Sequence, residues 1–255
     1  MREQLPEHLL TKFGIIEGLG HRLNAEATIL DFGCGAGRSV HVLRDFGYKA
    51  YGCDIAMDAD TTYNSEDEDI DTDSMVRQNI LRLISDNPYS LPFEDGTFDF
   101  IFSEQVLEHV QNYSEVTSEL CRILKPGGIC LHIFPSRYYL IESHVYVPFA
   151  SIISSYYWLL FWASMRIRNE YQTGLSATET ARLNFEYLRD CTNYLPKKTI
   201  KDHFDDYFDE VVFCEELFLR HSKRGRKLST LIKWFPFLPS IYSTLKARVL
   251  FAKVT

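Results

Sequence analysis

Three glycines alternate with small residues directly after an apolar run that ends in an acidic side chain. The run Ile29–Phe32 contains Asp31, and Gly33, Gly35 and Gly37 follow it with one residue between each pair. Because glycine has no Cβ, the backbone of such a turn can bend sharply and pass close to a ligand. The dinucleotide-binding fingerprint would need a further glycine where Arg38 stands. The spacing therefore predicts a turn that holds a nucleotide-like cofactor.

The elements around this turn are those of an α/β sheet. The apolar run before the turn predicts a strand, and apolar residues at helical spacing from Ser39 to Phe46 predict a helix that Gly47 ends. A second strand, 49–54, ends at Asp54, about twenty positions after the turn. A carboxylate at that place either binds the hydroxyls of a ribose or caps an ordinary turn.

Two further strands are predicted downstream. The stretch 91–103 reads as a turn that leads into a buried strand, and 120–128 reads as a helix that ends at Lys125–Gly128. The residues 129–134 then form the next strand, and 208–214 and 247–254 are candidates for the last two. An amphipathic helix is expected at Glu7–Leu23 and others at 178–194 and 201–207.

Four of these segments together resemble the class I S-adenosylmethionine-dependent methyltransferases, in particular a small-molecule group. They are DFGCGAG, the strand end at Asp54, LPFEDGTFDFIFSEQVLEHV and ELCRILKPGG, within residues 25–135. The resemblance implies a Rossmann-like, doubly wound sheet of seven strands, mostly parallel, with an antiparallel last strand. It also implies that S-adenosylmethionine binds at the carboxyl ends of the strands and leaves as S-adenosylhomocysteine.

The resemblance also assigns cofactor contacts. Asp31 would lie near the methionine amino group, the glycine turn under the methionine and ribose, and Asp54 on the ribose hydroxyls. Adenine would be held by Asp86 or by its neighbour Asn87. The full set that we expect to bind the cofactor is Asp31, Gly33, Cys34, Gly35, Gly37, Asp54, Ile55, Asp86, Asn87 and Ser103.

The family presents the methyl group near Ser103, which implies that Glu104, Glu108 and His109 lie beside the transfer centre. A hydroxyl acceptor needs a base, and histidine suits that role at neutral pH. The alternative is that Glu108 and His109 only shape the pocket. Their spacing is similar to that of ubiquinone-biosynthesis O-methyltransferases, where such residues can hold a divalent ion. Gln105 replaces one acidic position here, so we expect no metal.

A long insertion, 136–200, occupies the place where the family recognises acceptors. Its segment Ser143–Met165 has no Asp, Glu, Lys or Arg and many aromatic residues. Serines, a proline and its place between two strands argue against a membrane span. We expect an acceptor lid, with His144 and Glu142 as polar groups at its mouth, although an ordinary packed histidine is an equal alternative.

A second insertion, 220–246, is basic and aromatic. Either it packs on the first insertion or it anchors the protein to anionic lipid. In the first case the aromatic rings of the two insertions bury one another over the cofactor pocket. These rings are Trp158, Phe161 and Trp162 in one insertion and Trp234, Phe235 and Phe237 in the other.

Composition limits the class of substrate. The net charge is -8, and the stretch 220–255 carries nine Lys and Arg and no acid, so the rest of the chain is strongly acidic. Such a surface disfavours nucleic acid as a partner. Six scattered cysteines without a CxxC pair indicate reduced thiols in a cytoplasmic protein, with membrane association left open. The acidic stretch 58–73 lacks the glycine and the distal glutamate of a calcium loop.

These observations predict a single methyltransferase domain, 1–255. We expect O-methylation of a small-molecule, sugar or lipid-linked acceptor. The alternatives are N- or C-methylation of a small metabolite, and a catalytically silent subunit that binds the cofactor. The sequence leaves the oligomeric state open.

Overall fold

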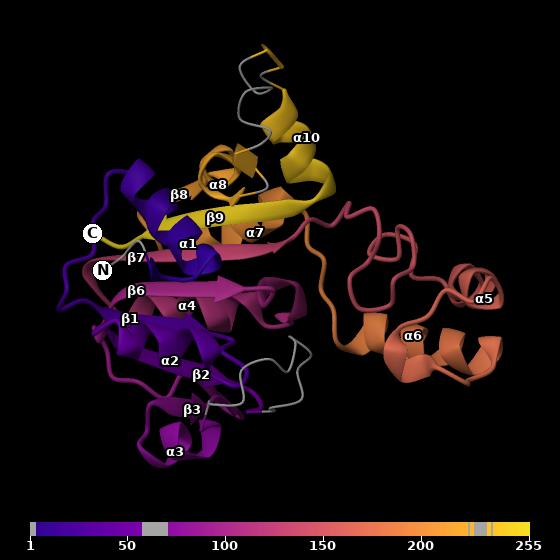
Figure 1. Ribbon diagram of the computed structural model, residues 1–255, viewed down its shortest axis with the longest axis horizontal. Coiled ribbons are helices and arrows are strands. Elements are labelled where there is room, and N and C mark those ends of the chain that lie inside the picture. Colours follow the sequence, from indigo (N-terminus) through magenta and orange to yellow (C-terminus); the bar gives the residue numbers. More distant parts are fainter. Residues whose placement is uncertain (1–3, 58–70, 224, 227–233, 236) are drawn as a thin grey trace.

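A seven-stranded sheet forms the centre of the computed structural model, which describes residues 4–57, 71–223, 225–226, 234–235 and 237–255 (Figure 1). Its strand order is β3-β2-β1-β6-β7-β9-β8. The strands are β1 (Thr28–Phe32), β2 (Lys49–Asp54), β3 (Leu81–Leu83), β6 (Phe98–Glu104), β7 (Leu124–Pro135), β8 (Glu210–Phe213) and β9 (Ala247–Lys253). The strands from β3 to β7 pair in parallel, and β9 runs antiparallel to both of its neighbours. The predicted fold class is confirmed.

Helices cover both faces of this sheet, because neighbouring strand residues alternate between them. Leu30 and Ile101 belong to one apolar core, while Ile29 and Phe100 belong to the other. The helices of the main domain are α1 (Glu7–Gly18), α2 (Arg38–Asp45), α3 (Thr72–Arg77), α4 (Tyr113–Ile123), α7 (Lys197–Asp205), α8 (Glu215–His221) and α10 (Leu238–Leu245). Helices α4 and α7 supply the first core, and α1 and α2 supply the second.

Several element boundaries differ from the sequence-based expectation. Helix α6 (Ala177–Asp190) ends before the expected residue 194, and α7 begins at Lys197 rather than at residue 201. Helix α1 ends at Gly18 rather than near Leu23. Helix α4 ends at Ile123, and Lys125–Gly128 already belongs to β7. The Lys-Pro-Gly-Gly stretch therefore starts a strand instead of ending a helix, since the backbone N–H of Gly127 donates to Val254 at the end of the antiparallel neighbour.

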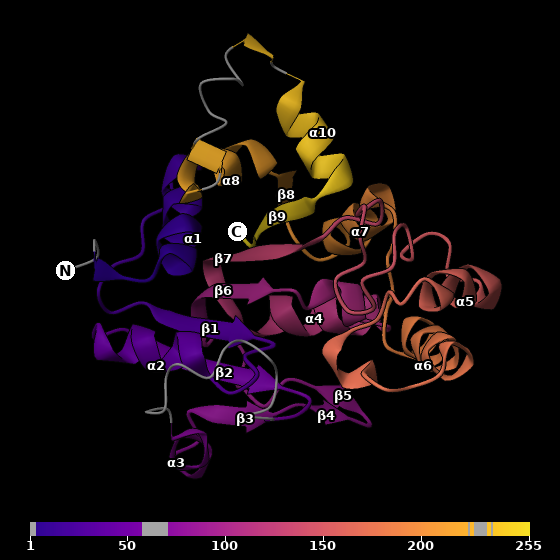
Figure 2. The ribbon, with the colours of Figure 1, turned by 45° about the vertical axis from the view of Figure 1, so that its right-hand side comes forward.

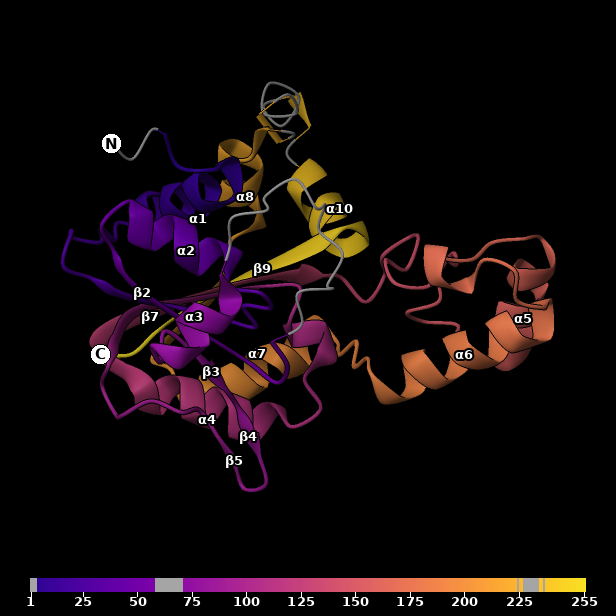
Figure 3. The same ribbon diagram turned by 60° about the horizontal axis from the view of Figure 1, so that its bottom comes forward.

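The insertion 136–200 projects beyond the carboxyl ends of β6 and β7 (Figures 1 and 3). It contains α5 (Tyr156–Ser164), a 3₁₀ turn (Glu170–Gln172) and α6 (Ala177–Asp190). The two helices pack on each other around a small apolar core of their own. That core consists of Val145, Val147, Ala150, Leu159, Ala163, Ala181 and Leu188. The insertion is thus a unit with its own interior.

The expected packing between the aromatic rings of the two insertions is wrong. Helices α5 and α10 lie apart in all three ribbon views (Figures 1–3). In the described part of the chain, Trp158, Phe161 and Trp162 make ring contacts within their own set, and Phe235 contacts Phe237. The physical reason is that α5 packs on α6 around the core of the insertion, which holds α5 away from α10.

Much of this aromatic surface faces solvent. Tyr157 on α5 is 81% exposed and Trp234 is 79% exposed. Part of the basic run 223–227 and most of the acidic stretch 58–73 lie outside the described residues. No helix within the described ranges combines the length and apolar character needed to cross a bilayer. All six cysteines are free thiols.

Candidate active site

The glycine turn adopts the geometry for which its sequence is suited. Gly33, Gly35 and Gly37 have φ values of 79°, 51° and 84°, a region that side chains with a Cβ rarely enter. The Gly33 N–H donates to the carbonyl of Cys53 over 2.8 Å, which fastens the turn to the end of β2. A Cβ on Gly33 would lie 2.2 Å from the Val106 side chain, so no larger residue fits there.

Asp54 closes the turn from the neighbouring strand. One carboxylate oxygen accepts from the Gly35 N–H and the other from the Ile55 N–H, each over 2.7 Å. Each oxygen has a further lone pair for a ligand hydroxyl. Asp54 therefore both fixes the turn and stands at the strand end where a ribose is expected. The ribose contact itself, and that of the exposed Ile55, stay predictions.

Asp31 lies near the carboxyl end of β1 and is almost fully buried, with 7% of its surface exposed. Burial raises the pKa of this carboxyl to about 7, against the opposing effect of the Lys12 ammonium, and the nearby Glu104 and Asp54 raise it further. An acid in such a place holds a proton near neutral pH until a cation arrives. The charged amino group of the cofactor is the partner that the sequence predicts for it.

Glu104 does not stand free as a catalytic group. Its carboxylate accepts from the Lys12 ammonium over 2.6 Å, and the Lys12 side chain is only 2% exposed. Burial alone would raise the pKa of Glu104, but the ion pair with Lys12 holds it below its usual value. The catalytic role of Glu104 stays a prediction, and in this structure its carboxylate is paired with Lys12. Lys12 was missed, although a basic residue on the apolar face of α1 was a signal.

Four other residues predicted to bind the cofactor take different positions. The Ser103 hydroxyl is fully buried, 2.7 Å from Nδ1 of His132. Cys34 lies half-buried in the glycine turn, and its N–H donates to Cys53. Asp86 and Asn87 are exposed at the tip of the hairpin of β4 (Ser85–Asp86) and β5 (Tyr89–Ser90), which projects from the domain (Figure 3). Contacts of these residues with the cofactor stay predictions.

Glu108 lies on the side of the site where the acceptor is expected, which we call the acceptor side. It belongs to a short 3₁₀ turn (Leu107–His109) that follows β6. Its side chain is fully buried, and neither carboxylate oxygen has a hydrogen-bond partner among the described residues. Burial raises the pKa of Glu108 to about 8, and the nearby Glu142 adds to this shift. A small cavity beside it is lined by Tyr113, Phe134, Arg137 and Tyr194, among others.

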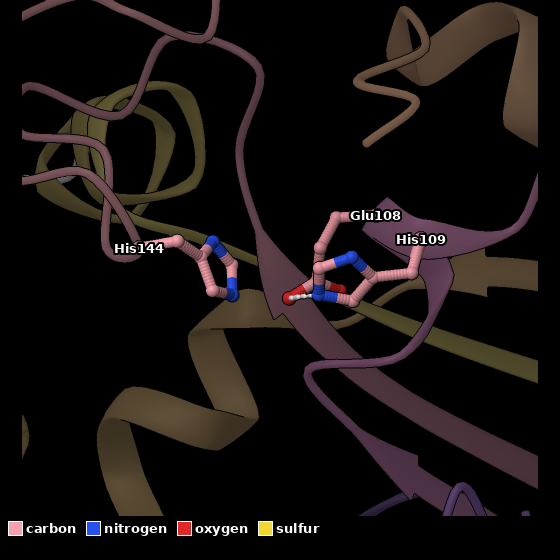
Figure 4. A group of neighbouring side chains, drawn as sticks. All are labelled: Glu108, His109 and His144. Carbon is pink, nitrogen blue, oxygen red and sulfur yellow. Dashed lines mark ion pairs between the residues drawn. The ribbon is translucent and has the colours of Figure 1, made fainter. Parts of the chain in front are cut away.

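Two histidines meet at this carboxylate (Figure 4). His109 lies next to it in sequence, whereas His144 comes from the insertion, and their ring centroids are 4.9 Å apart. Nε2 of His109 is 3.9 Å from Oε1 of Glu108. Burial lowers the pKa of His109, which favours the neutral imidazole that a base needs. The structure thus brings together three of the four predicted catalytic residues.

Glu142 orients the insertion side of this site. Its fully buried carboxylate accepts from the N–H groups of His144 and Val145, the Tyr194 hydroxyl and Nδ1 of His144. Burial would raise the pKa of Glu142, but these hydrogen bonds, first that of His144, hold it below its usual value. Tyr194 had no signal in the sequence, because its contact with Glu142 spans 52 positions.

Fold and site together define the class of protein. The strand order, the glycine turn and the acid at the end of β2 are those of a class I S-adenosylmethionine-dependent methyltransferase. In agreement, residues 30–132 match a sequence family model described as a methyltransferase domain. Residues 30–132 therefore match a methyltransferase domain, and the sheet around them has the class I topology.

Curated relatives match the same part of the chain. A sterol 4-C-methyltransferase of Caenorhabditis elegans is 30% identical over 109 residues, 42% of this chain and 30% of that protein. A 2-methyl-6-phytyl-1,4-hydroquinone methyltransferase of Synechocystis is 30% identical over 103 residues, 40% and 30% of the two chains. The matched part spans less than half the length of such relatives.

One solved structure aligns with a larger part of this chain than the curated relatives do. The S-adenosylmethionine-dependent methyltransferase of Mesorhizobium loti aligns with 97% of this chain and 100% of its own, with a TM-score of 0.50 and 13% identity. At that identity the likeness concerns the fold alone.

Proposed function

We propose that this protein transfers the methyl group of S-adenosylmethionine to the oxygen of a small-molecule acceptor. The observation that carries the proposal is the meeting of two sets of residues at one edge of the sheet. β1, β2 and β6 run in parallel, so Asp31, Asp54 and the turn that holds Glu108 and His109 all follow the carboxyl ends of neighbouring strands. Open α/β sheets bind their ligands at this edge.

In the proposed reaction the acceptor oxygen attacks the methyl carbon in line with the sulfonium. The C–O bond forms as the C–S bond breaks, and the sulfur keeps the electron pair in S-adenosylhomocysteine. The proton of the acceptor hydroxyl passes to the cluster of Glu108, His109 and His144. Positioning of the two reactants supplies much of the acceleration in such a step.

The surroundings favour an acceptor with an apolar body and one reactive hydroxyl. The insertion offers Tyr187 beside His144, with ring centroids 5.4 Å apart, and a largely uncharged segment around it. The names of the sterol and phytyl-hydroquinone methyltransferases also denote apolar acceptors. A C-methyl product is the alternative, since the name of the sterol enzyme denotes C-methylation.

Methyl-deuterated S-adenosylmethionine tests the proposal directly. The full chain is incubated with it and with a lipid and metabolite extract, and labelled products are sought by mass spectrometry. We expect an O-methylated product that loses its label under ether or ester cleavage. A label that resists such cleavage would place the methyl group on carbon, and S-adenosylhomocysteine formation without the protein would expose a background reaction.

A further inference from the structure

A group of three potential metal ligands forms where the insertion meets the sheet (Figure 4). Glu108, His109 and His144 each offer one donor atom, and these atoms all lie within 4.8 Å of one another. We propose that the three side chains bind one divalent transition-metal ion, with Zn²⁺ as the representative of that class. The binding of the ion stands on this geometry, while its role in methyl transfer rests on the proposed function.

The hydrogen bonds of His109 and His144 leave Nε2 of each imidazole free to bind a metal ion. Nδ1 of His109 is 2.6 Å from the carbonyl oxygen of Cys191, which can only accept, so Nδ1 carries the proton. Nδ1 of His144 likewise lies 2.7 Å from a carboxylate oxygen of Glu142. Metal-binding histidines typically donate one ring N–H to a carbonyl or carboxylate in this way. Both Nε2 atoms then keep a lone pair.

Glu108 needs a positively charged partner. Its carboxylate is fully buried and both of its oxygens lack a hydrogen-bond partner among the described residues. Buried polar atoms are nearly always partnered, and an unpartnered carboxylate is costly. A divalent cation would stabilise the ionised carboxylate, which two neutral imidazoles do not.

The ligand types and the number of ligands fit such an ion. Two imidazoles and one carboxylate are a known ligand set for Zn²⁺ and other first-row divalent ions. Zn–ligand bonds of about 2.0–2.1 Å in a tetrahedron place donors roughly 3.3 Å apart. The cluster must therefore contract by up to about 1.5 Å. The partly exposed rings of His109 and His144, at 32% and 26% exposure, allow this. Three protein ligands leave one position open.

This set is not the one that spacing along the sequence suggested. Glu104 forms an ion pair with Lys12 and does not belong to the group of potential ligands. His144 from the insertion is the third member of that group instead. A bound ion would therefore tie the insertion to the sheet. At the open position it would bind the acceptor oxygen and lower the pKa of that hydroxyl, which is how metal ions generate oxygen nucleophiles. With the ion bound, the proton of the hydroxyl would pass to water, because the three side chains then serve as ligands and not as the base.

Metal binding is measured on the untagged, chelator-stripped full chain. We expect one Zn²⁺ per chain by calorimetry, a rise in the melting temperature with Zn²⁺, and visible d–d absorption when Co²⁺ replaces it. His144→Ala and Glu108→Gln should each weaken Zn²⁺ binding by at least about 100-fold. Glu142→Ala, which removes the acceptor of the His144 N–H, should weaken it about 10- to 100-fold. His41→Ala, on the exposed face of α2, is the matched control and should bind as the unchanged protein does.

Glu108→Gln separates a ligand from a structural residue. Without metal, this variant should melt at or above the temperature of the unchanged protein, because it replaces a buried carboxyl group without hydrogen-bond partners by a neutral amide. With Zn²⁺ it should show no rise. Absence of stoichiometric Zn²⁺ binding, or equal affinity in Glu108→Gln and the unchanged protein, would overturn the proposal. S-adenosylhomocysteine is titrated in parallel. If the protein binds S-adenosylhomocysteine but not Zn²⁺, only the metal site is refuted. If it binds Zn²⁺ but not S-adenosylhomocysteine, the proposed methyl transfer is refuted.

Discussion

The two sides of the site differ in how their polar atoms are satisfied. On the cofactor side, both oxygens of Asp54 accept backbone N–H groups, and the glycine turn is fastened to β2. On the acceptor side, Glu108 has no partner for either oxygen within the described residues, and two imidazole nitrogens face it. The first side is built before its ligand binds, while the second is completed by what it binds.

From this difference we expect the two sides to have separate functions. Variants on the cofactor side should change the affinity for S-adenosylmethionine, and variants on the acceptor side should change turnover at saturating cofactor. A variant that changes both would mean that the two sides are one structural unit.

The largest effect is expected from Gly35→Val, which places a branched side chain at φ 51° where the ligand must approach. Cofactor binding should fall below detection in calorimetry, with helical content retained in circular dichroism. Gly47→Val is the matched control, because Gly47 has φ 87° and nothing within 4 Å of its added Cβ. Equal loss of binding in both variants would show that backbone strain, and not the site, is responsible.

His109→Ala should lower turnover by about 10²–10⁴-fold, the range for loss of acid–base assistance. The affinity for S-adenosylmethionine should stay within about twofold, because His109 belongs to the acceptor side. Steady-state rates at saturating cofactor, beside a calorimetric titration, measure the two quantities. A parallel loss of cofactor affinity would instead support a role for His109 in shaping the pocket.

Asp54→Ala should weaken cofactor binding by about 1–3 kcal/mol, the scale for a lost hydrogen bond to a charged group. Turnover at saturating cofactor should change little. Asp54→Asn keeps one acceptor oxygen and should lie between the two. If Asp54→Ala fails to fold, then its bonds to Gly35 and Ile55 serve the fold rather than the ligand.

A smaller, graded effect is expected from Asp31, whose pKa near 7 without ligand implies a proton that the cationic cofactor must displace. Below that pH the free protein holds the proton, so affinity should fall by up to about tenfold per pH unit, and above it should be constant. Titrations between about pH 5 and pH 7 measure this, and Asp31→Asn should remove the slope. An affinity that does not depend on pH in the unchanged protein would contradict the contact between Asp31 and the cofactor.

The same pKa shift of Asp31 implies that the stability of the free protein falls as pH rises from 3.8 towards 7, because the unfolded chain ionises first.

The sheet and the cofactor turn could be predicted because their signals are local. The glycine spacing, the strand end at Asp54 and the strand at 98–103 each lie within a short stretch, and backbone hydrogen bonds complete them. Alternating apolar residues likewise fix which strand residues face each core. The antiparallel last strand followed from the resemblance and was confirmed.

The acceptor side could be predicted only in part, because tertiary contacts assemble it. Lys12 and Glu104 form an ion pair although they lie 92 positions apart, and no local sequence pattern predicts that pair. His144 reaches Glu108 only after the insertion has packed on its own core, and Cys191 then fixes the tautomer of His109 across 82 positions. The same self-packing explains why the expected contact between the two aromatic insertions was wrong.

The central claim is that the edge of the sheet at Asp31, Gly35 and Asp54 binds S-adenosylmethionine. Calorimetric titration of the full chain with S-adenosylmethionine, and then with S-adenosylhomocysteine, tests it most directly. We predict one binding site per chain for each ligand, competition between them, and no binding heat in Gly35→Val. Absence of binding in the folded, unchanged protein would contradict the account.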